Sequence, residues 1–309
     1  MGEITSELDI RYVKLEFTLT FPNSCVLPIS KASAIRGGMG EMLLRANCIR
    51  DRNCDNCDFV EECIVQRTMY SRFENKPDFM SPSDSVGYVV ECENYEEKFE
   101  AGDELRFYLI LFGMTIVYFN QYMSALFALG QNGLGKDKAK FYISQVKNNI
   151  GQPILDGNNI FMEYYQIDTI ANYVNRRMKD IRQECCNELK FKSATTIKYH
   201  GSFIQEFNME AIVNAIKRRI YILDLFENID GEDLYKSQFE LPEIIDQDIK
   251  TVKTRRYSSR KNAGMPLQGI KGTVVLDIIP DEIMPLLLAG EILHIGKNTS
   301  FGFGRYIVK

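Results

Sequence analysis

The chain begins with a strand, as its apolar positions indicate. Between residues 11 and 21, every second residue from Val13 to Phe21 is apolar, while the intervening positions are mainly polar. A period of two places one set of side chains on one face of a strand, so the pattern predicts a half-buried strand.

A helix follows over residues 31–46. Apolar residues recur there at spacings of three and four and form one helical face, namely Ile35, Met39, Leu43 and Ala46. The same segment contains Gly37, Gly38 and Gly40, each of which weakens a helix by up to about 1 kcal/mol. We therefore expect these glycines to permit the close approach of a strand or of RNA.

The remaining pattern predicts one unit used twice. In the first half, strands at 86–92 and 104–112 precede a helix at 116–129 and a strand at 140–146. The second half repeats the order, with a strand at 189–199, a helix at 209–226, strands near 249–256 and 273–278, a short helix at 281–289 and a strand at 304–308. This order is the βαββαβ, ferredoxin-like pattern.

The predicted class is therefore α+β, with two tandem ferredoxin-like (RRM-like) domains. The first covers residues 1–150 and carries a cysteine-rich insertion at about 48–82. A linker with a bridging helix covers 151–187, and the second domain covers 188–309. Two domains also agree with the length of 309 residues, since domains are typically about 100–150 residues long.

A short sequence pattern that occurs in both halves supports the duplication. Ala128-Leu129-Gly130 leads through Gly135-Lys136 to Phe141-Tyr142-Ile143, and Leu288-Ala289-Gly290 leads through Gly296-Lys297 to Tyr306-Ile307-Val308. Both halves thus pass from their second helix to their last strand through a glycine-lysine loop. The alternative is that glycine and lysine are simply common in turns.

Composition narrows the class of protein. The hydrophobic fraction of 45% and the charged fraction of 26% are ordinary for a globular protein, and no apolar run approaches the roughly 20 residues that cross a bilayer. The first residues show no secretory signal, so we expect a cytoplasmic protein without membrane partners. The net charge of −5 argues against indiscriminate coating of nucleic acid, so any nucleic-acid site must be local.

Two segments have the composition of such a local site. The C-terminal loop has small, polar and cationic residues, namely Gly296, Lys297, Asn298, Thr299, Ser300, Gly302, Gly304 and Arg305. Glycines let a phosphate approach backbone N–H groups, and the cations add charge. The alternative is a structural loop packed against the sheet. No GxxxxGK[ST] run occurs, so nucleotide hydrolysis is not indicated.

The second segment is a cationic strip in an otherwise acidic chain. It contains Arg255, Arg256, Tyr257, Ser258, Arg260 and Lys261. Cations and hydroxyls in sequence are typical of phosphate contacts, although charge clusters also occur on ordinary solvated faces.

Four cysteines form a candidate metal site. Cys48, Cys54, Cys57 and Cys63 are spaced C-x5-C-x2-C-x5-C. Disulfides are not expected in a reducing cytosol, and four thiolates suit structural zinc or an iron–sulfur cluster. Zinc is favoured here, although the outer spacings are longer than in the common zinc ribbon. The alternative is a set of unligated cysteines.

The chain has two histidines, His200 and His294. His294 lies two residues before Gly296, where a phosphate chain would lie, and an imidazole with a pKa near about 6.5 can exchange protons there. A lone histidine is also often structural.

Three motifs together resemble the CRISPR-associated endoribonucleases that process precursor guide RNA, members of the RAMP superfamily. They are Ile35-Arg36-Gly37-Gly38-Met39-Gly40 with the cysteines and Tyr70-Ser71-Arg72-Phe73-Glu74; Arg256-Tyr257-Ser258-Ser259-Arg260 with Pro266-Leu267-Gln268-Gly269; and His294-Ile295-Gly296-Lys297 through Phe301-Gly302-Phe303-Gly304-Arg305-Tyr306. The last run is similar to the glycine-rich loop of that superfamily.

The resemblance implies a metal-independent reaction in which the RNA 2′-OH attacks the adjacent phosphate and leaves a 2′,3′-cyclic phosphate, with no cofactor for catalysis. Many members of the family place an acid–base histidine near the first helix, and this chain has none between Lys31 and Cys48. His294 is therefore the first catalytic candidate, with Lys297, Arg36 and Lys31 as electrostatic partners.

The expected partners are CRISPR repeat RNA in precursor guide RNA and subunits of a CRISPR effector complex. The rival interpretation is a non-catalytic RAMP subunit that binds RNA in such a complex. An iron–sulfur redox protein would account for the cysteines but for neither cationic segment.

Overall fold

The computed structural model describes residues 8–70, 73, 77–80, 85–181, 187–229, 231–258 and 263–309, with backbone alone at 55, 254–258 and 263–267. The chain divides into two compact units. The N-terminal unit contains Tyr12–Ile167 and Tyr257–Ala263, and the C-terminal unit contains Asp168–Arg256 and Gly264–Lys309 together with residues 8–11.

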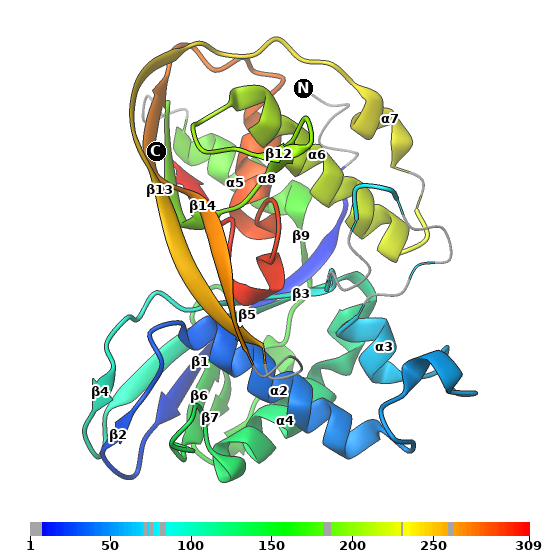
Figure 1. The fold of residues 1–309 in the computed structure, drawn as a ribbon, viewed down its shortest axis with the longest axis vertical. Coiled ribbons are helices and arrows are strands. Elements are labelled where there is room, and N and C mark those ends of the chain that lie inside the picture. The colour runs from blue at the N-terminus through cyan, green and yellow to red at the C-terminus, as the bar shows by residue number, and fades with distance from the viewer. Residues whose placement is uncertain are drawn as a thin grey trace. The chain divides into compact units, whose positions relative to one another are not determined.

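The N-terminal unit has the βαββαβ order. Its elements are β1 (Arg11–Thr20), α2 (Lys31–Asn47), β3 (Tyr88–Glu91), β5 (Glu104–Phe112), α4 (Phe119–Asn132) and β6 (Tyr142–Lys147). The strands lie in the order β3-β5-β1-β6, and each neighbouring pair is antiparallel. Helices α2 and α4 lie side by side against this sheet (Figure 1).

The core of this unit lies between the sheet and these two helices. The alternating residues of β1 are buried as the pattern predicts, and Phe17 pairs with Phe107 on β5 with their rings stacked at 4.9 Å. Ile35 and Met39 of α2 belong to the same apolar core. Periodicity therefore identified the core face of both elements.

The glycines of α2 serve helix packing. A Cβ at Gly38 would lie 2.5 Å from a δ-carbon of Leu129 in α4, and a Cβ at Gly40 would lie 2.6 Å from the Cε of Met69. The expectation that a strand or RNA approaches these two positions is therefore wrong, because side chains from neighbouring segments fill the space.

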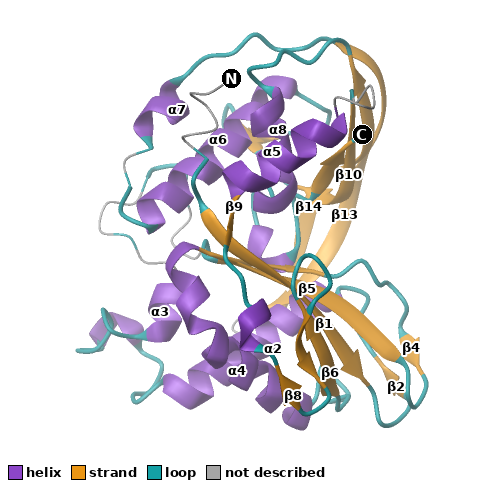
Figure 2. Ribbon diagram, turned by 180° about the vertical axis from the view of Figure 1, so that it is seen from behind, coloured by secondary structure: helices purple, strands orange, loops and turns teal. Residues whose placement is uncertain are grey.

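The C-terminal unit repeats the same topology. Its elements are β10 (Glu188–Thr195), α6 (Met209–Phe226), β13 (Ile244–Ser258), β14 (Ala263–Leu276), α8 (Met284–Leu293) and β15 (Tyr306–Val308). The strand order is β13-β14-β10-β15, so the first strand is again central and the last strand again pairs with it. With α5 (Ile170–Ile181), helices α6 and α8 cover one side of this sheet (Figure 2).

The predicted α+β class with two ferredoxin-like domains is thus confirmed. Short elements complete the two units: β2 (Cys25–Val26), α3 (Ile64–Thr68), β4 (Lys98–Phe99), β7 (Pro153–Asp156), β8 (Asn159–Ile160), β9 (Asp168–Thr169), β11 (Lys198–Tyr199), β12 (Ser202–Phe203) and α7 (Glu232–Lys236). Within the described part of the chain, no helix combines the length and apolar character that a bilayer crossing needs.

Candidate functional site

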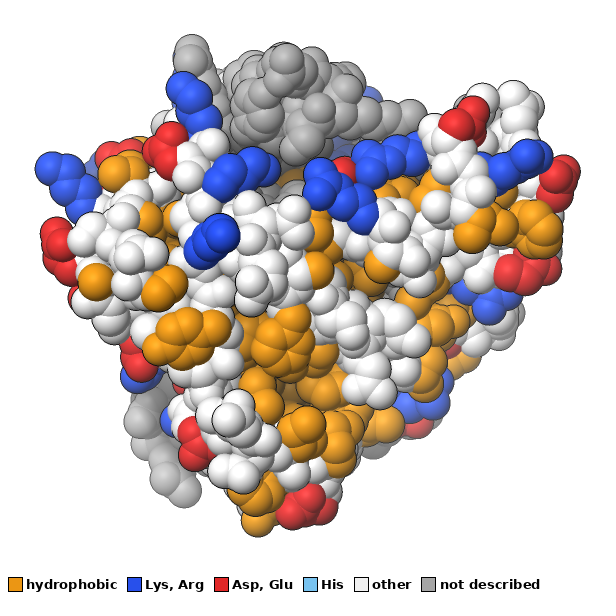
Figure 3. Space-filling model, turned by 90° about the horizontal axis from the view of Figure 1, so that it is seen from below, with side chains coloured by type: hydrophobic (Ala, Val, Ile, Leu, Met, Phe, Trp, Pro, Cys, Tyr) orange, Lys and Arg blue, Asp and Glu red, His pale blue; other side chains and the backbone are white. Residues whose placement is uncertain are grey.

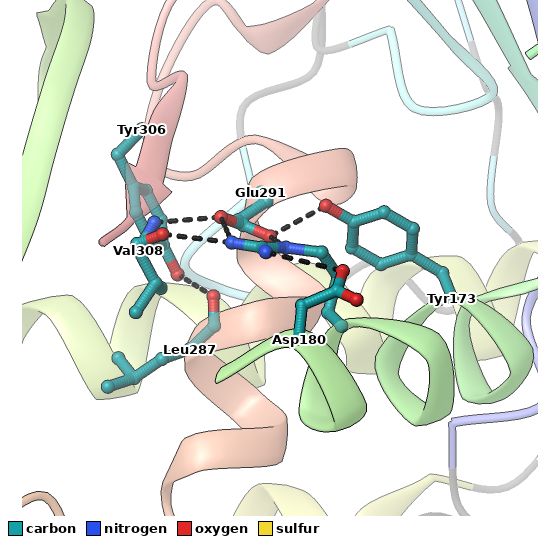
Figure 4. A network of polar contacts seen from close by, with 7 residues as sticks. Tyr173, Asp180, Leu287, Glu291, Tyr306 and Val308 are labelled. Atoms are coloured by element: carbon teal, nitrogen blue, oxygen red, sulfur yellow. Dashed lines mark hydrogen bonds and ion pairs between the residues drawn. The ribbon is translucent and has the colours of Figure 1, made fainter. Parts of the chain in front are cut away.

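The C-terminal loop, residues 294–305, begins where α8 ends, and a buried carboxylate fixes that helix to the last strand. Glu291 is 5% exposed. It accepts hydrogen bonds from the hydroxyl of Tyr173 at 2.6 Å, from Arg177 Nε at 3.1 Å and from the backbone N–H of Val308 at 2.7 Å (Figure 4). Both carboxylate oxygens of Glu291 therefore accept hydrogen bonds that join α8 to α5 and β15. Glu291 is thus a structural residue rather than a candidate catalytic carboxylate.

Arg177 closes the same network. Its guanidinium also donates to the carbonyl of Val308 at 2.9 Å and lies 3.7 Å from Asp180. Hydrogen bonding to Glu291 raises the pKa of Arg177, so its guanidinium stays charged. This arrangement stabilises both ends of the segment that carries the loop.

Tyr306 packs against α8. Its hydroxyl donates to the carbonyl of Leu287 at 2.6 Å (Figure 4), and a Cβ at Gly290 would lie 2.1 Å from that hydroxyl oxygen. In the N-terminal unit, a Cβ at Gly130 would lie 2.4 Å from the carbonyl oxygen of Phe141. The echoed glycines thus perform one task in both units, which is to let the second helix approach the last strand.

His294 caps α8 and is fully buried. Its φ is 56°, and its Nδ1–H donates to the carbonyl of Phe303 at 2.9 Å, since that oxygen can only accept. The bond joins the first residue of the loop to a residue near its end. The geometry supports a positioning role for this imidazole more strongly than contact with a substrate.

The glycines of the loop pack against its own chain. The N–H groups of Ile295, Lys297 and Gly304 donate to the carbonyls of Gly304, Thr196 and Ala194 at 3.0, 2.8 and 3.0 Å. A Cβ at Gly296 would lie 2.3 Å from the oxygen of Thr196, and both Gly296 and Gly304 have positive φ. The glycines were expected to let a phosphate approach backbone N–H groups of the loop. For the three N–H groups above this expectation is wrong, because each donates to a carbonyl of the protein.

The other predicted RNA-contacting residues of the loop differ in exposure. Thr299 and Ser300 are buried, whereas Lys297, Asn298, Gly302 and Arg305 are half-buried. RNA contact by the side chains of this loop stays a prediction.

The first turns of α2 carry the two other catalytic candidates. Lys31 is 1% exposed, and its ammonium donates to the carbonyls of Glu96 and of Pro28. Burial lowers the pKa of Lys31, although the carboxylates of Glu97 and Glu96 oppose the shift. Like His294, Lys31 is buried and its side chain is bonded to backbone carbonyls, so its part in catalysis stays a prediction.

Arg36 lies one turn further along α2. Its Nη2 donates to Ser85 Oγ at 2.8 Å, and its guanidinium lies 6.0 Å from the ring centre of Tyr88. Ser85 in turn donates to the carbonyl of Met69. Lys31 and Arg36 thus belong to the N-terminal unit, and His294 and Lys297 to the C-terminal unit.

Two tyrosines beside Arg36 had not been singled out from the sequence. Tyr88 and Tyr122 are 0% and 1% exposed, with ring centres 5.9 Å apart. Burial raises the pKa of both phenols. In the sequence they lie within apolar runs, so nothing there separates them from ordinary core residues.

The cationic strip is only partly described. Residues 255–258 extend β13 as backbone, so the side chains of Arg255, Arg256, Tyr257 and Ser258 are outside the described part. Arg260 and Lys261 lie outside the described residues altogether. On the face shown in Figure 3, lysine and arginine side chains gather along one border and hydrophobic side chains over the middle.

The four predicted metal ligands border one cavity without converging on one point. Cys48, Cys54, Cys57 and Cys63 all line one cavity of about 260 Å³. Among the described side chains, no three from histidine, cysteine, aspartate or glutamate converge as a single metal ion requires. Metal binding therefore stays a prediction.

Comparisons with known proteins give two family models. The CRISPR-associated endoribonuclease Cas6 model matches residues 189–306, and the AF_1859_N model, an N-terminal domain, matches residues 10–168. An uncharacterized protein of Archaeoglobus fulgidus is 23% identical over 305 residues, which cover 97% of this chain and 98% of that protein.

Solved structures share the fold. A Thermus thermophilus Cas6 in a product complex superimposes with a TM-score of 0.54 at 11% identity, covering 97% of this chain and all of that one. Chains of two Cas6-RT-Cas1–Cas2 complexes, one of them partial, give TM-scores of 0.57 at 12% identity. This chain spans 46% and 29% of those two chains, so it corresponds to only a part of each.

Proposed function

The chain belongs to the Cas6 family of CRISPR-associated endoribonucleases, and from this premise we propose that it binds and cleaves CRISPR repeat RNA in precursor transcripts to give guide RNAs. The observation that carries the proposal is the match of the Cas6 model to residues 189–306, the segment that runs from β10 through the C-terminal loop. The paired ferredoxin-like units support it.

The proposed reaction is transesterification within the RNA. The 2′-oxygen forms a bond to phosphorus as the bond from phosphorus to the 5′-oxygen breaks, which leaves a 2′,3′-cyclic phosphate and a 5′-hydroxyl. A base takes the 2′-OH proton, an acid supplies a proton to the leaving oxygen, and cations stabilise the charge on the phosphate oxygens. Such a reaction needs positioned side chains and no metal ion.

Lys31 and Arg36 are the candidates that α2 offers for this chemistry. We assign the proton transfer to Lys31, whose pKa is lowered by burial, and the contact with phosphate to Arg36, whose guanidinium matches phosphate geometry. Lys297 adds a cation from the C-terminal loop. For His294 we propose that the imidazole holds the loop in place, since it is buried and bonded to Phe303.

A second candidate function is a non-catalytic RNA-binding subunit of an effector complex. The burial of His294 favours it, because α2 contains no histidine that could replace His294 as acid or base.

One experiment separates these functions. The purified full-length chain is incubated with its cognate repeat RNA in EDTA, with a scrambled repeat as the control, and the product ends are identified by mass spectrometry. We expect a single cut that leaves a cyclic phosphate. Tight binding without cleavage would support the binding subunit, and cleavage that requires added metal would contradict the proposed mechanism.

A further inference from the structure

A short hairpin formed by β11 and β12, residues 197–204, lies directly beside the C-terminal loop. The residue before the hairpin is bonded to that loop, because the N–H of Lys297 donates to the carbonyl of Thr196 at 2.8 Å. A Cβ at Gly296 would also lie 3.0 Å from a γ-carbon of Ile197. The hairpin and the loop are therefore neighbours in the C-terminal unit, although they are far apart in the sequence.

The hairpin has a tight two-residue turn. Tyr199 pairs with Ser202, and the two residues between them, His200 and Gly201, have φ values of 44° and 82°. The commonest two-residue hairpin turn has positive φ at both central positions, and histidine accepts this more readily than most residues. The rings of Tyr199 and His200 are in contact, with centres 4.1 Å apart. The turn thus fixes which side chains share each face of the hairpin.

The two faces of the hairpin have different surroundings. The hydroxyl of Tyr199 is hydrogen-bonded to the carboxylate of Glu210 in the first turn of α6, and this bond raises the pKa of Tyr199. Phe203 pairs with Lys198, and successive side chains of a strand point to opposite faces, so these two lie on the other face. The face that carries Lys198 and Phe203, here called the Phe203 face, is therefore the one opposite the bond to Glu210.

An aromatic ring and positive charge lie together on the Phe203 face. Phe203 is 53% exposed, and its partner Lys198 is exposed as well. Arg218 of α6 donates to the carbonyl of Lys198 at 3.4 Å, which brings a guanidinium to the same strand. Because most of the Phe203 ring remains in water, burial in the core of the C-terminal unit contributes little to its placement.

An exposed ring beside cations is typical of a contact with single-stranded nucleic acid. A base stacks on the ring, and the cations attract the phosphates. Three backbone N–H groups of the neighbouring C-terminal loop donate within the protein, so exposed side chains are the better source of RNA contacts at this place. Bases in a duplex are already stacked on their neighbours, so an exposed ring favours an unpaired nucleotide.

We propose that the β11–β12 hairpin binds one unpaired nucleotide of the repeat RNA, with the base stacked on Phe203 and a phosphate held by Lys198. The inference rests on the proposed function, and it assigns part of the same RNA to a contact beside the C-terminal loop. Stacking uses the flat face of a base and not its hydrogen-bonding edge, so this contact tolerates different bases.

The chain contains no tryptophan, which permits a direct test by fluorescence. Phe203→Trp places a single indole at the proposed contact, and binding of the full-length variant to repeat RNA should quench its fluorescence. The RNA carries a 2′-deoxy nucleotide before the cut so that it stays intact. Removal of one base at a time from this RNA should restore the fluorescence at a single position.

Phe59→Trp is the matched control. Phe59 is also 53% exposed and belongs to the N-terminal unit, so its indole should keep its fluorescence when the same RNA binds. Equal quenching in both variants would overturn the proposal, because RNA would then quench exposed rings in general. No quenching of Phe203→Trp by RNA that binds would overturn it as well.

Affinity gives an independent readout. Phe203→Ala should weaken binding of the repeat RNA about tenfold, whereas Phe203→Tyr keeps a ring and should bind like the wild type. Lys198→Ala should reduce the slope of log affinity against log salt by about 0.7, as expected for one phosphate of a single strand. Circular dichroism checks that each variant folds.

The outcomes separate this inference from the proposed function. Wild-type affinity of folded Phe203→Ala would overturn the hairpin contact and leave the proposed function intact. A wild-type chain that binds no repeat RNA would overturn both.

Discussion

His294 shows how one residue can support two different interpretations. Its place beside the glycines suggested an acid or base, whereas its 0% exposure and its bond to Phe303 fit a residue that shapes the loop. Sequence spacing shows which residues are neighbours along the chain. The burial of the His294 imidazole depends on how the loop folds back, and sequence spacing does not predict that. The candidate was therefore found from the sequence, and its surroundings were not.

The positioning role makes a specific prediction for His294→Ala. Loss of the donor to the Phe303 carbonyl, with the space left behind, should lower the free energy of unfolding by about 1–3 kcal/mol. The pH profile of single-turnover cleavage should keep its shape, and His294→Asn should restore part of the stability, because Asn tolerates positive φ and has a donor. If His294→Ala removed one ionisation from the pH profile and left the stability unchanged, the imidazole would be catalytic.

The buried phenols predict a loss of stability in alkali. Burial raises the pKa of Tyr122 and of Tyr306 above that of an unfolded tyrosine. The folded state then binds these protons more tightly, so the stability they contribute is complete below about pH 10 and falls as pH rises further. Denaturant unfolding between about pH 8 and about pH 11 should show a shallower decline for Tyr122→Phe than for the wild type. An identical slope in both proteins would refute this assignment.

At the scale of elements, periodicity succeeded where one face is buried. The helix expected at 209–226 and the strand expected at 104–112 have the same bounds in the structure. Periodicity failed where both faces of a strand are exposed to solvent. Most described side chains of β13 are exposed, so no alternation of apolar and polar residues marked its full length of 15 residues. The hairpin of β7 and β8 was also missed, because such short strands carry too few positions for a period.

The echoed glycines give a prediction at this scale. A Cβ at Gly290 would lie 2.1 Å from the hydroxyl of Tyr306, so Gly290→Ala should destabilise the chain by about 1–3 kcal/mol. Adding Tyr306→Phe should recover part of this loss, because it removes the atom that the new methyl group meets. Chemical denaturation of the single and double variants measures the coupling.

Gly37→Ala is the matched control. Gly37 lies inside α2, and a Cβ added there would meet nothing within 4 Å, so alanine should be neutral or stabilise by up to about 1 kcal/mol. If both alanine variants had the same effect, helix propensity rather than close packing would explain these glycines.

At the scale of the whole molecule, one topology occurs twice and has different chemistry in each copy. The N-terminal unit holds Lys31, Arg36 and the four cysteines from Cys48 to Cys63, and the C-terminal unit holds the glycine-rich loop with His294. The duplication was predictable because each unit must bury the same kind of sheet face beneath two helices. The side chains that act on RNA were not predictable, since their identity depends on local burial and on partners outside the chain.

The central claim is that the RNA's own 2′-hydroxyl performs the cleavage. The most direct measurement is a set of cognate repeat RNAs, each with a single 2′-deoxy nucleotide, incubated with the full-length protein in EDTA. We predict that one substitution, at the nucleotide before the cut, abolishes cleavage while binding changes less than about twofold, because only that hydroxyl attacks phosphorus. Cleavage that persists with every substituted RNA would contradict the account.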